Sequence, residues 1–530
     1  MFIDVCMGLD KMKMWLMSEE WKDIYNEETA DAKADEFQKL LSREFNRCFP
    51  EKLVKVANDD QPWITQKLKT LDRQRKRCYH RSRRSNKWKN LNKQFKKELK
   101  MKKSNFYKKM ASDLKEKDPK KWYSVLKRFT TQEKEGEIKI AEIEHLSNQE
   151  QCEPIADELA KVPNEYSPLH TEDILIPEFQ ERNIPQFSPA QVWQKLANIN
   201  PNKSSTRDDV PGKILKLYAA YFAEPLSHIM NCSIRSGQYP DIWKIEIATP
   251  IPKAYPTLRI TDLRNISGLL NCDKIAEKLI SELIMEDMKN HMDKAQYGNM
   301  KNKSINYYLI NMIHRILSAL DNNSRREIFA VVANLIDWSK ALPRQCPKLG
   351  VQSFIKNNVR PALIPILVSF FQNRRMRLKW HSCISNPKPL PGGGPAGGTL
   401  GILEYLSQSN HSADCVTSED RYKFLDDLSV LEIINLLTVG ITSFNLRSQV
   451  PSDIPDHNQY IPPNNLKSQE YLDKINQWTK NQKMLINQKK TKTMIFNFTQ
   501  NYKFTTRLRL NDETVEVVPE QKVIKDNNTK

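Results

Sequence analysis

The chain has 530 residues, of which 39% are hydrophobic, and it carries a net charge of +19. Residues 73–128 hold 23 Lys and Arg against 4 Asp and Glu, so the rest of the chain is neutral overall. A basic segment on a neutral body is typical of a protein that binds a polyanion; a basic membrane-surface segment is the alternative. The nine cysteines have no C-x-x-C spacing, which argues against a disulfide framework and against a zinc site.

The sequence shows no targeting or membrane-spanning pattern. Its N-terminus lacks the basic start and apolar core of a signal peptide. Its most apolar run, residues 361–371, contains two prolines and is too short to cross a bilayer. We therefore expect an intracellular protein, in the nucleus or the cytoplasm, with reduced thiols and no membrane partner.

The first 130 residues favour helices. In the N-terminal helical segment, residues 1–60, one helical face carries Phe37, Leu40, Leu41 and Phe45. Residues 61–130 form a basic helical region. Apolar residues recur there at helical spacing: Trp88, Leu91, Phe95, Leu99, Phe106, Met110 and Leu114. Such a stripe packs on a neighbouring helix, while the Lys and Arg residues on the other faces meet phosphate groups or water.

The rest of the chain has an α+β pattern. Residues 131–187 are acidic and rich in turn formers, so we expect a linker there. Residues 188–242 continue with helices. From residue 243 to residue 500 short β-like runs alternate with helices, and residues 501–530 begin a hairpin.

Two predicted turns are polar. Residues 421–433, "RYKFLDDLSVLEI", form a strand, a tight turn and a second strand, with Asp426 and Asp427 at the turn. The hairpin near the end of the chain turns at Asn511 and Asp512. Adjacent carboxylates repel each other and lose hydration when half-buried, so the acids at the first turn need a compensating partner.

A third acid and a glycine cluster accompany the acidic turn. Asp337 ends a β-branched apolar run, where it faces a cleft or simply starts a turn. Six of the 14 glycines lie between Gly392 and Gly401; they let the backbone approach a ligand closely, or they form a flexible linker. Asp337, Asp426 and Asp427 together supply the three acids that two divalent ions need for phosphoryl transfer. Mg²⁺ is the expected ion, and Mn²⁺ can replace it.

Eight motifs follow one another along residues 243–500. In chain order they are "ATPIPK", "DLRNIS", "DKIAEKL", "AQYGN", "LIDWSKAL", "GGGPAGGTLG", "KFLDD" and "INQKKTKTMIF". Each motif alone is weak, but their order and spacing resemble the reverse transcriptase of non-LTR (LINE-type, jockey-like) retrotransposons. Upstream, the segment from "QPWIT" to "KKWYSVLKRF" resembles the basic linker that precedes this domain in such elements.

The resemblance implies a right-hand polymerase fold of fingers and palm, with an antiparallel palm sheet preceded by a basic α-helical region. It implies an RNA-directed DNA polymerase that uses an RNA template, a DNA primer, dNTPs and two Mg²⁺ ions. Asp337 and Asp426 match the metal-binding acids of the palm, and Asp427 is their supporting neighbour. Lys490, one of four lysines between residues 483 and 492, matches a lysine that protonates the leaving pyrophosphate.

The resemblance also implies substrate contacts. Lys253 and Arg264 match basic finger positions that hold the triphosphate; their alternative is a role as surface cations. The loop that lies under nucleotide and template is matched by Gly394, Pro395, Ala396 and Gly397. Leu342 stands where the family usually has an aromatic side chain that blocks the ribose 2′-hydroxyl. Ala396 stands where Gln is usual.

Departures from the family pattern motivate a second hypothesis. Leu342, Ala396 and the ends of the chain are also consistent with a catalytically inactive element remnant that binds RNA or DNA through its basic helices. An intact element carries an endonuclease ahead of this region and a helical thumb after it, and we expect this chain to lack the endonuclease and most of the thumb. A telomerase-like cellular polymerase is a third alternative, which the motifs fit less well. The sequence leaves the oligomeric state open.

Overall fold

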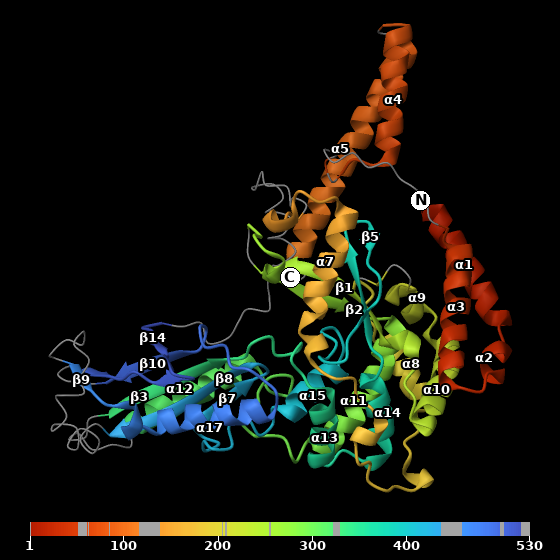
Figure 1. Cartoon of the computed structure of the whole chain (residues 1–530). Coiled ribbons are helices and arrows are strands. Elements are labelled where there is room, and N and C mark those ends of the chain that lie inside the picture. Colours follow the sequence, from red (N-terminus) through yellow and green to blue (C-terminus); the bar gives the residue numbers. More distant parts are fainter. Residues whose placement is uncertain are drawn as a thin grey trace. The chain divides into compact units, whose positions relative to one another are not determined.

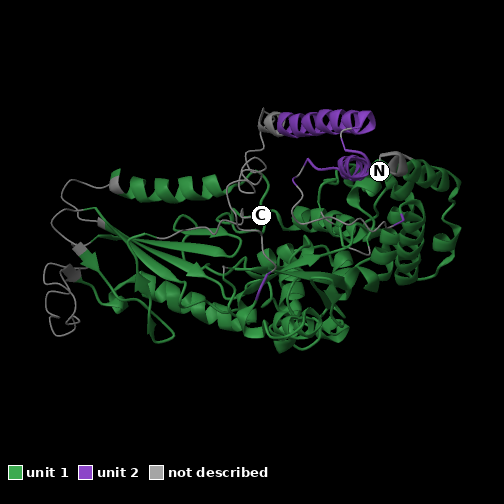
Figure 2. Ribbon diagram, turned by 90° about the horizontal axis from the view of Figure 1, so that it is seen from above, with its two compact units in different colours: residues 1–49, 140–530 green, residues 50–139 purple. Residues whose placement is uncertain are grey.

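The structure is a computed structural model of the chain. It describes residues 2–50, 61, 63–83, 85–115, 138–203, 205–206, 209–253, 256–321, 329–435, 458–498 and 503–520. The chain divides into two compact units, one formed by residues 1–49 and 140–530 and the other by residues 50–139 (Figure 2). None of the helices in the described ranges is both long and apolar enough to span a membrane.

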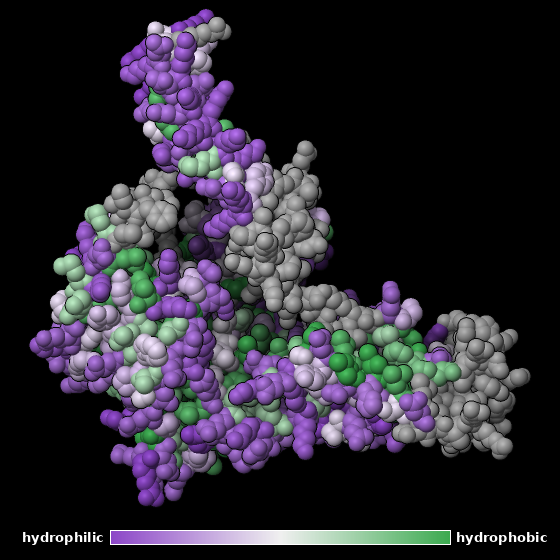
Figure 3. Space-filling model, turned by 180° about the vertical axis from the view of Figure 1, so that it is seen from behind, coloured by the Kyte–Doolittle hydropathy of each residue, from purple (hydrophilic) through white to green (hydrophobic). Residues whose placement is uncertain are grey.

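Two helices make up most of the described part of the second unit: α4 (Gln66–Arg81) and α5 (Asn86–Lys115). Helix α4 begins at Thr65, whose hydroxyl oxygen accepts a hydrogen bond from the Leu68 amide. The two helices pack against each other along their lengths, and the surface around them is mostly hydrophilic (Figure 3). This agrees with a basic helical region that buries only one narrow apolar face.

The predicted apolar stripe lies on α5 and faces α4. The Arg75 guanidinium lies 4.5 Å from the centre of the Phe95 ring, and the ring centres of Tyr79 and Trp88 are 5.6 Å apart. The described stripe residues are half-buried: Trp88, Leu91, Phe95, Leu99 and Phe106. The side chains of Met110 and Leu114 lie outside the described residues. The stripe is therefore the packing face, which leaves most of the Lys and Arg side chains on the surface.

Helices from both ends of the chain's first half form the helical part of the first unit. They are α1 (Phe2–Ser18), α2 (Lys22–Asn26), α3 (Ala30–Cys48), α8 (Pro189–Ala197), α9 (Gly212–Leu217) and α10 (Ala219–Ser236). The predicted helical face is confirmed: Phe37, Leu40 and Leu41 are buried, and the half-buried Phe45 packs against the same core. Phe37 meets the Phe222 ring of α10, with the ring centres 6.3 Å apart.

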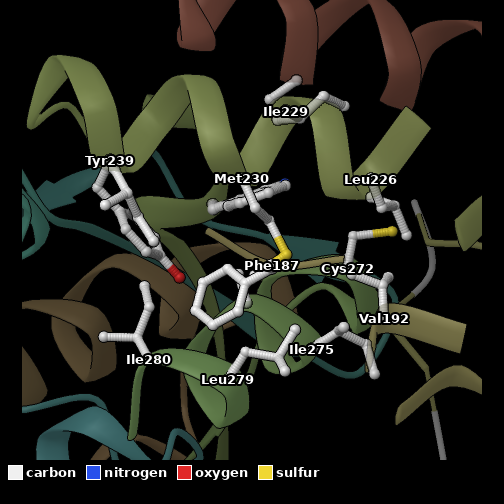
Figure 4. Close-up of a cluster of buried hydrophobic side chains, with 14 of the residues drawn as sticks. Phe187, Val192, Leu226, Ile229, Met230, Tyr239, Cys272, Ile275, Leu279 and Ile280 are labelled. Carbon is white, nitrogen blue, oxygen red and sulfur yellow. The ribbon is translucent and has the colours of Figure 1, made fainter. Parts of the chain in front are cut away.

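The same apolar cluster joins α8 and α10 to α11 (Asn271–Met288). Figure 4 shows Met230 of α10 and Phe187 pointing toward Ile275 and Leu279 of α11. Helices α13 (Pro347–Lys356), α14 (Ile364–Phe371) and α15 (Leu400–Gln408) extend the same core. The apolar run at residues 361–371 is thus core, as its burial throughout α14 indicates.

Part of the segment expected to be a linker, residues 131–187, is ordered. Helix α7 (Asn148–Lys161) begins with a capping box between Ser147 and Glu150. It packs on strand β4 (Arg375–Trp380), where the Trp380 indole nitrogen donates a hydrogen bond to a Gln151 side chain at 2.9 Å. The acidic composition is compatible with this order because its carboxylates pair with distant cations, as Glu153 does with Lys388 at 2.8 Å.

The first of two five-stranded sheets contains the first two motifs, "ATPIPK" and "DLRNIS", in its strands β1 and β2. Its strands run in the order β2-β1-β4-β5, with β6 also paired to β4. Their bounds are β1 (Ile245–Pro252), β2 (Leu263–Gly268), β4, β5 (Cys383–Ile384) and β6 (Lys388–Pro389). The β1–β4 pair is parallel and the other pairs are antiparallel. A parallel pair requires a crossover, which here spans more than 100 residues and contains β3 of the second sheet.

The second sheet has the strand order β14-β10-β3-β8-β7. Its strands are β3 (Phe329–Asp337), β7 (Arg421–Phe424), β8 (Asp427–Asn435), β10 (Lys492–Asn497) and β14 (Glu516–Val517). The four strands β10, β3, β8 and β7 are antiparallel, as predicted, and β14 pairs in parallel with β10. The coarse prediction of an α+β fold is therefore confirmed.

Helices cover both faces of this sheet (Figure 1). On one face α12 (Ile305–Asp321) packs Tyr308, Met312 and Ile316 against β3 and β8. On the other face lie α17 (Lys467–Asn481) and its buried Leu472. The opposite side of α12 exposes Tyr307, Ile310, Ile313 and Leu317, and Figure 3 shows a patch of apolar residues on this side of the molecule.

Short strands complete the described C-terminal part. Strands β9 (Asn458–Tyr460) and β11 (Lys503–Thr505) pair in parallel. Strands β12 (Arg509–Leu510) and β13 (Glu513–Thr514) form the predicted hairpin. Its turn residues Asn511 and Asp512 both have positive φ, 48° and 66°. Asn and Asp tolerate this conformation, which is why this pair makes a tight hairpin turn.

Candidate active site

The three predicted acids meet at one end of the second sheet. Asp337, the last residue of β3, lies directly opposite Asp427, the first residue of β8. Phe424 pairs with Asp427 across the β7–β8 hairpin, so Leu425 and Asp426 form its two-residue loop. The predicted strand, turn and strand are confirmed, but the turn lies one residue earlier than predicted, so that Asp427 begins β8. Asp337 is only 7% exposed, so its side chain is largely shielded from bulk solvent at the end of the strand.

The "AQYGN" motif holds the turn that carries Asp426. Leu425 has a φ of +54°, a strained conformation for a branched residue. Its amide donates a hydrogen bond of 3.2 Å to the Gln296 side-chain oxygen, which also accepts one of 2.9 Å from the Gly298 amide. A side chain at Gly298 would place its Cβ 2.4 Å from the Leu425 nitrogen. Gly298 is therefore required for the close approach that supports the turn.

A cavity of about 590 Å³ gathers most of the predicted site residues. The predicted residues on its wall are Lys253, Arg264, Asp337, Leu342, Gly394, Pro395, Ala396, Asp426 and Lys490. Asp427 and Gly397 are not on the wall. Asp427 is instead paired with Asp337 in the sheet, and Gly397 packs against β2. Segments separated by more than 200 residues thus contribute to one cavity.

The loop before β10 brings Lys490 to the acids. The Asn487 amide donates a 2.7 Å hydrogen bond to the Asp337 carbonyl oxygen. In return, the Asp337 amide donates one of 3.3 Å to the Thr491 hydroxyl. Because β10 runs antiparallel to β3, its start lies beside the end of β3. The register of this pair therefore places a lysine and a carboxylate on the same cavity.

Of the five described cations on the cavity wall, four lie close to one another. Burial lowers the pKa of Lys253, and the nearby charges of Lys340, Lys490 and Arg264 lower it further. All four line the cavity. Lys253 also donates a 2.6 Å hydrogen bond to the Thr261 carbonyl. Sequence reasoning missed Lys340, although its position three residues after Asp337 was a usable signal. The cluster shares its cavity with Asp337 and Asp426 and favours a polyanionic ligand.

The glycine-rich loop packs too tightly for larger residues at two of the predicted positions. A Cβ at Gly394 would lie 2.3 Å from the Gln345 side-chain oxygen, and one at Gly397 would lie 2.1 Å from the Ser267 carbonyl oxygen. The Gly394 amide donates a 3.2 Å hydrogen bond to the Leu342 carbonyl oxygen. These contacts show an ordered loop and argue against the flexible-linker alternative.

A buried carboxylate anchors the end of this loop. Glu277 of α11, within the "DKIAEKL" motif, accepts hydrogen bonds from the amides of Thr399 and Leu400, the latter at 3.1 Å. These amides lie at the N-terminus of α15, where unpaired backbone N–H groups favour a negative partner. Glu277 is fully buried. It was not predicted as a site residue, because nothing in its sequence context shows that it reaches a loop 120 residues away.

Four further buried acids lie near Arg374, a cation of the cavity wall. Arg374 lines the cavity and is 3% exposed. Its positive charge favours the ionised form of four buried acids and so lowers their pKa: Glu246, Asp273, Glu277 and Glu404. Burial nevertheless raises the pKa of all four carboxyl groups, and that of Glu404 to about 8. Burial thus outweighs the charge of Arg374, and also that of Lys274 near Asp273 and Glu277, and it favours the neutral form of these acids.

The acids at the cavity fit a divalent cation by their donor chemistry. Within the described ranges, no three His, Cys, Asp or Glu side chains are grouped closely enough to hold a metal ion by themselves. Mg²⁺, however, commonly takes only one or two carboxylates and completes its shell with water and substrate phosphates. Asp337 and Asp426 offer hard oxygen donors on one wall, and the cationic wall can hold such phosphates.

An α+β fold with paired acids and a cationic cavity is compatible with a nucleotide-polymerising enzyme, and comparison with known proteins points the same way. No family model matches the chain. The probable RNA-directed DNA polymerase from transposon X-element of Drosophila melanogaster is 25% identical over 233 residues, which cover 43% of this chain and 25% of that protein. The RNA-directed DNA polymerase from mobile element jockey of the same species is 23% identical over 316 residues, 58% of this chain and 31% of that protein.

A third relative has a similar name. The probable RNA-directed DNA polymerase from Drosophila melanogaster transposon BS is 24% identical over 218 residues, 41% of this chain and 23% of that protein. The chain thus spans about a quarter to a third of the length of the curated relatives it matches. These matches confirm the resemblance to the reverse transcriptases of non-LTR retrotransposons.

Proposed function

We propose that this chain is an RNA-directed DNA polymerase that extends a DNA primer on an RNA template by nucleotidyl transfer. The observation that carries the proposal is one cavity with Asp337 and Asp426 on its wall together with Lys253, Arg264 and Lys490. The resemblance to mobile-element polymerases supports the same reaction. In this proposal the β2-β1-β4-β5 sheet belongs to the fingers and the β14-β10-β3-β8-β7 sheet is the palm of a right-hand polymerase.

The acids are the proposed metal ligands. Asp337 and Asp426 would hold two Mg²⁺ ions, and Asp427 would support them from its paired position opposite Asp337. When bound, such ions activate the primer hydroxyl and stabilise the leaving phosphate oxygens. The hairpin loop and the end of β3 keep both acids at fixed positions on the sheet, which favours preorganised binding.

The cations are the proposed triphosphate ligands. Lys253 and Arg264, on the hairpin that joins β1 to β2, would bind the phosphates of the incoming dNTP and orient them toward the acids. Lys490 would donate a proton from its Nζ to the departing pyrophosphate. Binding through several cations at once holds the reacting phosphate in place, which accounts for a large part of catalysis in phosphoryl transfer.

The glycine-rich loop and Leu342 are the proposed nucleotide-contacting surface. Gly394, Pro395 and Ala396 would lie under the nucleotide and the template base, with Gly397 fixing the loop on β2. Leu342 would lie near the sugar. The basic helices α4 and α5 would bind the phosphate backbone of template RNA or primer DNA.

Primer extension tests this proposal. The purified protein is incubated with an RNA template, a DNA primer, dNTPs and Mg²⁺ or Mn²⁺, and compared with Asp337→Asn and Asp426→Asn. Wild type should extend the primer, and both variants should fall to background because each loses a charged metal ligand. Asp512→Asn, in the exposed hairpin turn with positive φ, is the matched control and should extend like wild type. Equal product from wild type and Asp426→Asn would contradict the proposal.

The second candidate function is nucleic-acid binding without catalysis, and the charge of the second unit favours it. RNA binding should then be strong, salt-sensitive and independent of Asp426. Deleting residues 73–128 should abolish it, because this segment holds the excess positive charge. Unchanged RNA affinity after the deletion would rule out binding through the basic helices. Absence of dNTP incorporation by a folded protein that binds RNA would favour this candidate over the polymerase.

A further inference from the structure

A buried tyrosine lines the same cavity as the proposed catalytic acids. Tyr405 belongs to α15, the helix that follows the glycine-rich loop. It is 2% exposed, yet it lines the same cavity as Asp337 and Asp426. The hydroxyl of a buried tyrosine usually has a hydrogen-bond partner. The surroundings of this hydroxyl are therefore informative about its role.

The Tyr405 hydroxyl has no hydrogen-bond partner among the described residues. The Ser409 hydroxyl, four residues further along the chain, is close enough to interact with it, but no hydrogen bond of full geometry joins the two. Leaving such a group unsatisfied costs about 1–3 kcal/mol, so a site that retains it usually supplies a partner in its working state. Other buried tyrosines of the same unit are satisfied: the Tyr422 hydroxyl donates to the Glu419 carbonyl oxygen at 2.6 Å.

The Tyr405 hydroxyl lies near the Ser409 hydroxyl and in the electrostatic field of the three acids, two of which, Asp337 and Asp426, share its cavity. Burial raises the pKa of Tyr405 well above its usual value, and the charges of Asp426, Asp427 and Asp337 raise it further. A phenol in these surroundings stays protonated and acts as a donor. Unlike a lysine, it stabilises an ionised carboxylate without neutralising the charge that would attract a cation.

We propose that the Tyr405 hydroxyl donates its single hydrogen bond to one carboxylate of the pair on its cavity wall, Asp337 or Asp426, and so positions this pair for divalent cations. Tyr405 is then a positioning residue, and this inference rests on the proposed function of the acids as metal ligands. Groups that hydrogen-bond to metal-ligating side chains commonly change metal affinity by about 10–100-fold when removed. The sequence motif gave no sign of this role, because Tyr405 occupies an ordinary core position of an apolar helix.

Direct measurement of Mn²⁺ binding tests the inference without relying on catalysis. Mn²⁺ is titrated into the full chain without nucleotide, and free Mn²⁺ is followed by its electron paramagnetic resonance signal. Tyr405→Phe should bind Mn²⁺ about tenfold more weakly than wild type. Tyr422→Phe is the matched control, since it removes another buried hydroxyl from the same unit, and should leave the Kd unchanged. Circular dichroism and the Tm of each variant show whether it is folded.

Two outcomes separate this inference from the proposed function. If Asp426→Asn abolishes Mn²⁺ binding while Tyr405→Phe binds as tightly as wild type, the acids bind the cation and the role of Tyr405 is refuted. If Asp337→Asn and Asp426→Asn both bind like wild type, the metal site itself is refuted and the inference falls with it. An equal loss of affinity in Tyr405→Phe and Tyr422→Phe would show a general effect of buried hydroxyls and also refute the inference.

Discussion

The side-chain oxygen of Gln296 accepts a hydrogen bond from the backbone amide of Leu425, 129 residues further along the chain, at a distance of 3.2 Å. The same region adds two backbone hydrogen bonds: the Tyr297 amide donates to the Lys423 carbonyl oxygen, and the Lys423 amide donates to the Ala295 carbonyl oxygen. The two-residue turn that carries Asp426 is thus held from outside its own hairpin.

Replacing Gln296 should loosen this turn. In Gln296→Ala the Leu425 amide loses its partner while Leu425 remains in a strained conformation, so we expect a loss of about 1–3 kcal/mol in the free energy of unfolding. Primer extension should fall more than stability alone explains, because Asp426 is no longer held in place. Urea denaturation and primer extension measure the two effects. Gln469→Ala, which removes hydrogen bonds to Arg509 in another part of the unit, should reduce stability without a specific loss of extension.

Stability should depend on pH through Glu404. Its pKa is raised from 4.5 to about 8 in the folded chain, chiefly by burial. The folded state therefore holds a proton that the unfolded state releases above pH 4.5, so the free energy of unfolding is highest below this pH and falls as pH rises toward 8. Glu404→Gln should remove this part of the slope, on the order of a few kcal/mol.

The control for Glu404 is an exposed acid of the same type. Glu172→Gln, on the surface, should leave the pH profile unchanged. Denaturant unfolding at pH 5, 6.5 and 8 gives the three points needed. Profiles for wild type and Glu404→Gln that run parallel would show that Glu404 does not titrate between these values.

Leu342 should determine sugar discrimination. A leucine leaves more room beside the ribose 2′-hydroxyl than an aromatic ring does, so wild type should reject ribonucleotides poorly. In Leu342→Phe the ratio of kcat/KM for dNTP to that for the matching rNTP should rise by about tenfold or more. Leu217→Phe, at an exposed position of α9, should not change this ratio. If Leu342→Phe rejects ribonucleotides no better than wild type, Leu342 does not face the sugar.

Lys340 should strengthen nucleotide binding. It belongs to the four-cation group of the cavity and also lies 3.8 Å from Glu158. Lys340→Ala should raise the KM for dNTP about fivefold, with a smaller change in kcat, because it removes one of several charges near the triphosphate. The effect should shrink at high salt. Lys356→Ala, an exposed lysine on α13, should leave KM unchanged; an equal effect of both variants would indicate only a change in overall charge.

The sequence by itself determined much of the local structure. Alternating and β-branched runs predicted β3, β7 and β8. Turn-forming residues predicted the hairpin at Asn511–Asp512 and, one residue later than observed, the hairpin turn at Asp426–Asp427. These features depend on interactions between residues a few positions apart, which leave a periodic pattern in the chain. The order of the motifs was also sufficient to identify the resemblance to mobile-element polymerases.

Only the tertiary structure decided which distant segments share a surface. Glu277 caps α15 across more than 120 residues of sequence. Lys340 lies near the cations Lys253 and Arg264, and Tyr405 lines the same cavity as Asp337 and Asp426. It also decided that α7 packs on β4 within a segment expected to be a linker. None of these contacts leaves a periodic signal, because each depends on how whole elements pair and pack. A buried carboxylate or hydroxyl looks like a surface residue in the sequence until the fold removes its water.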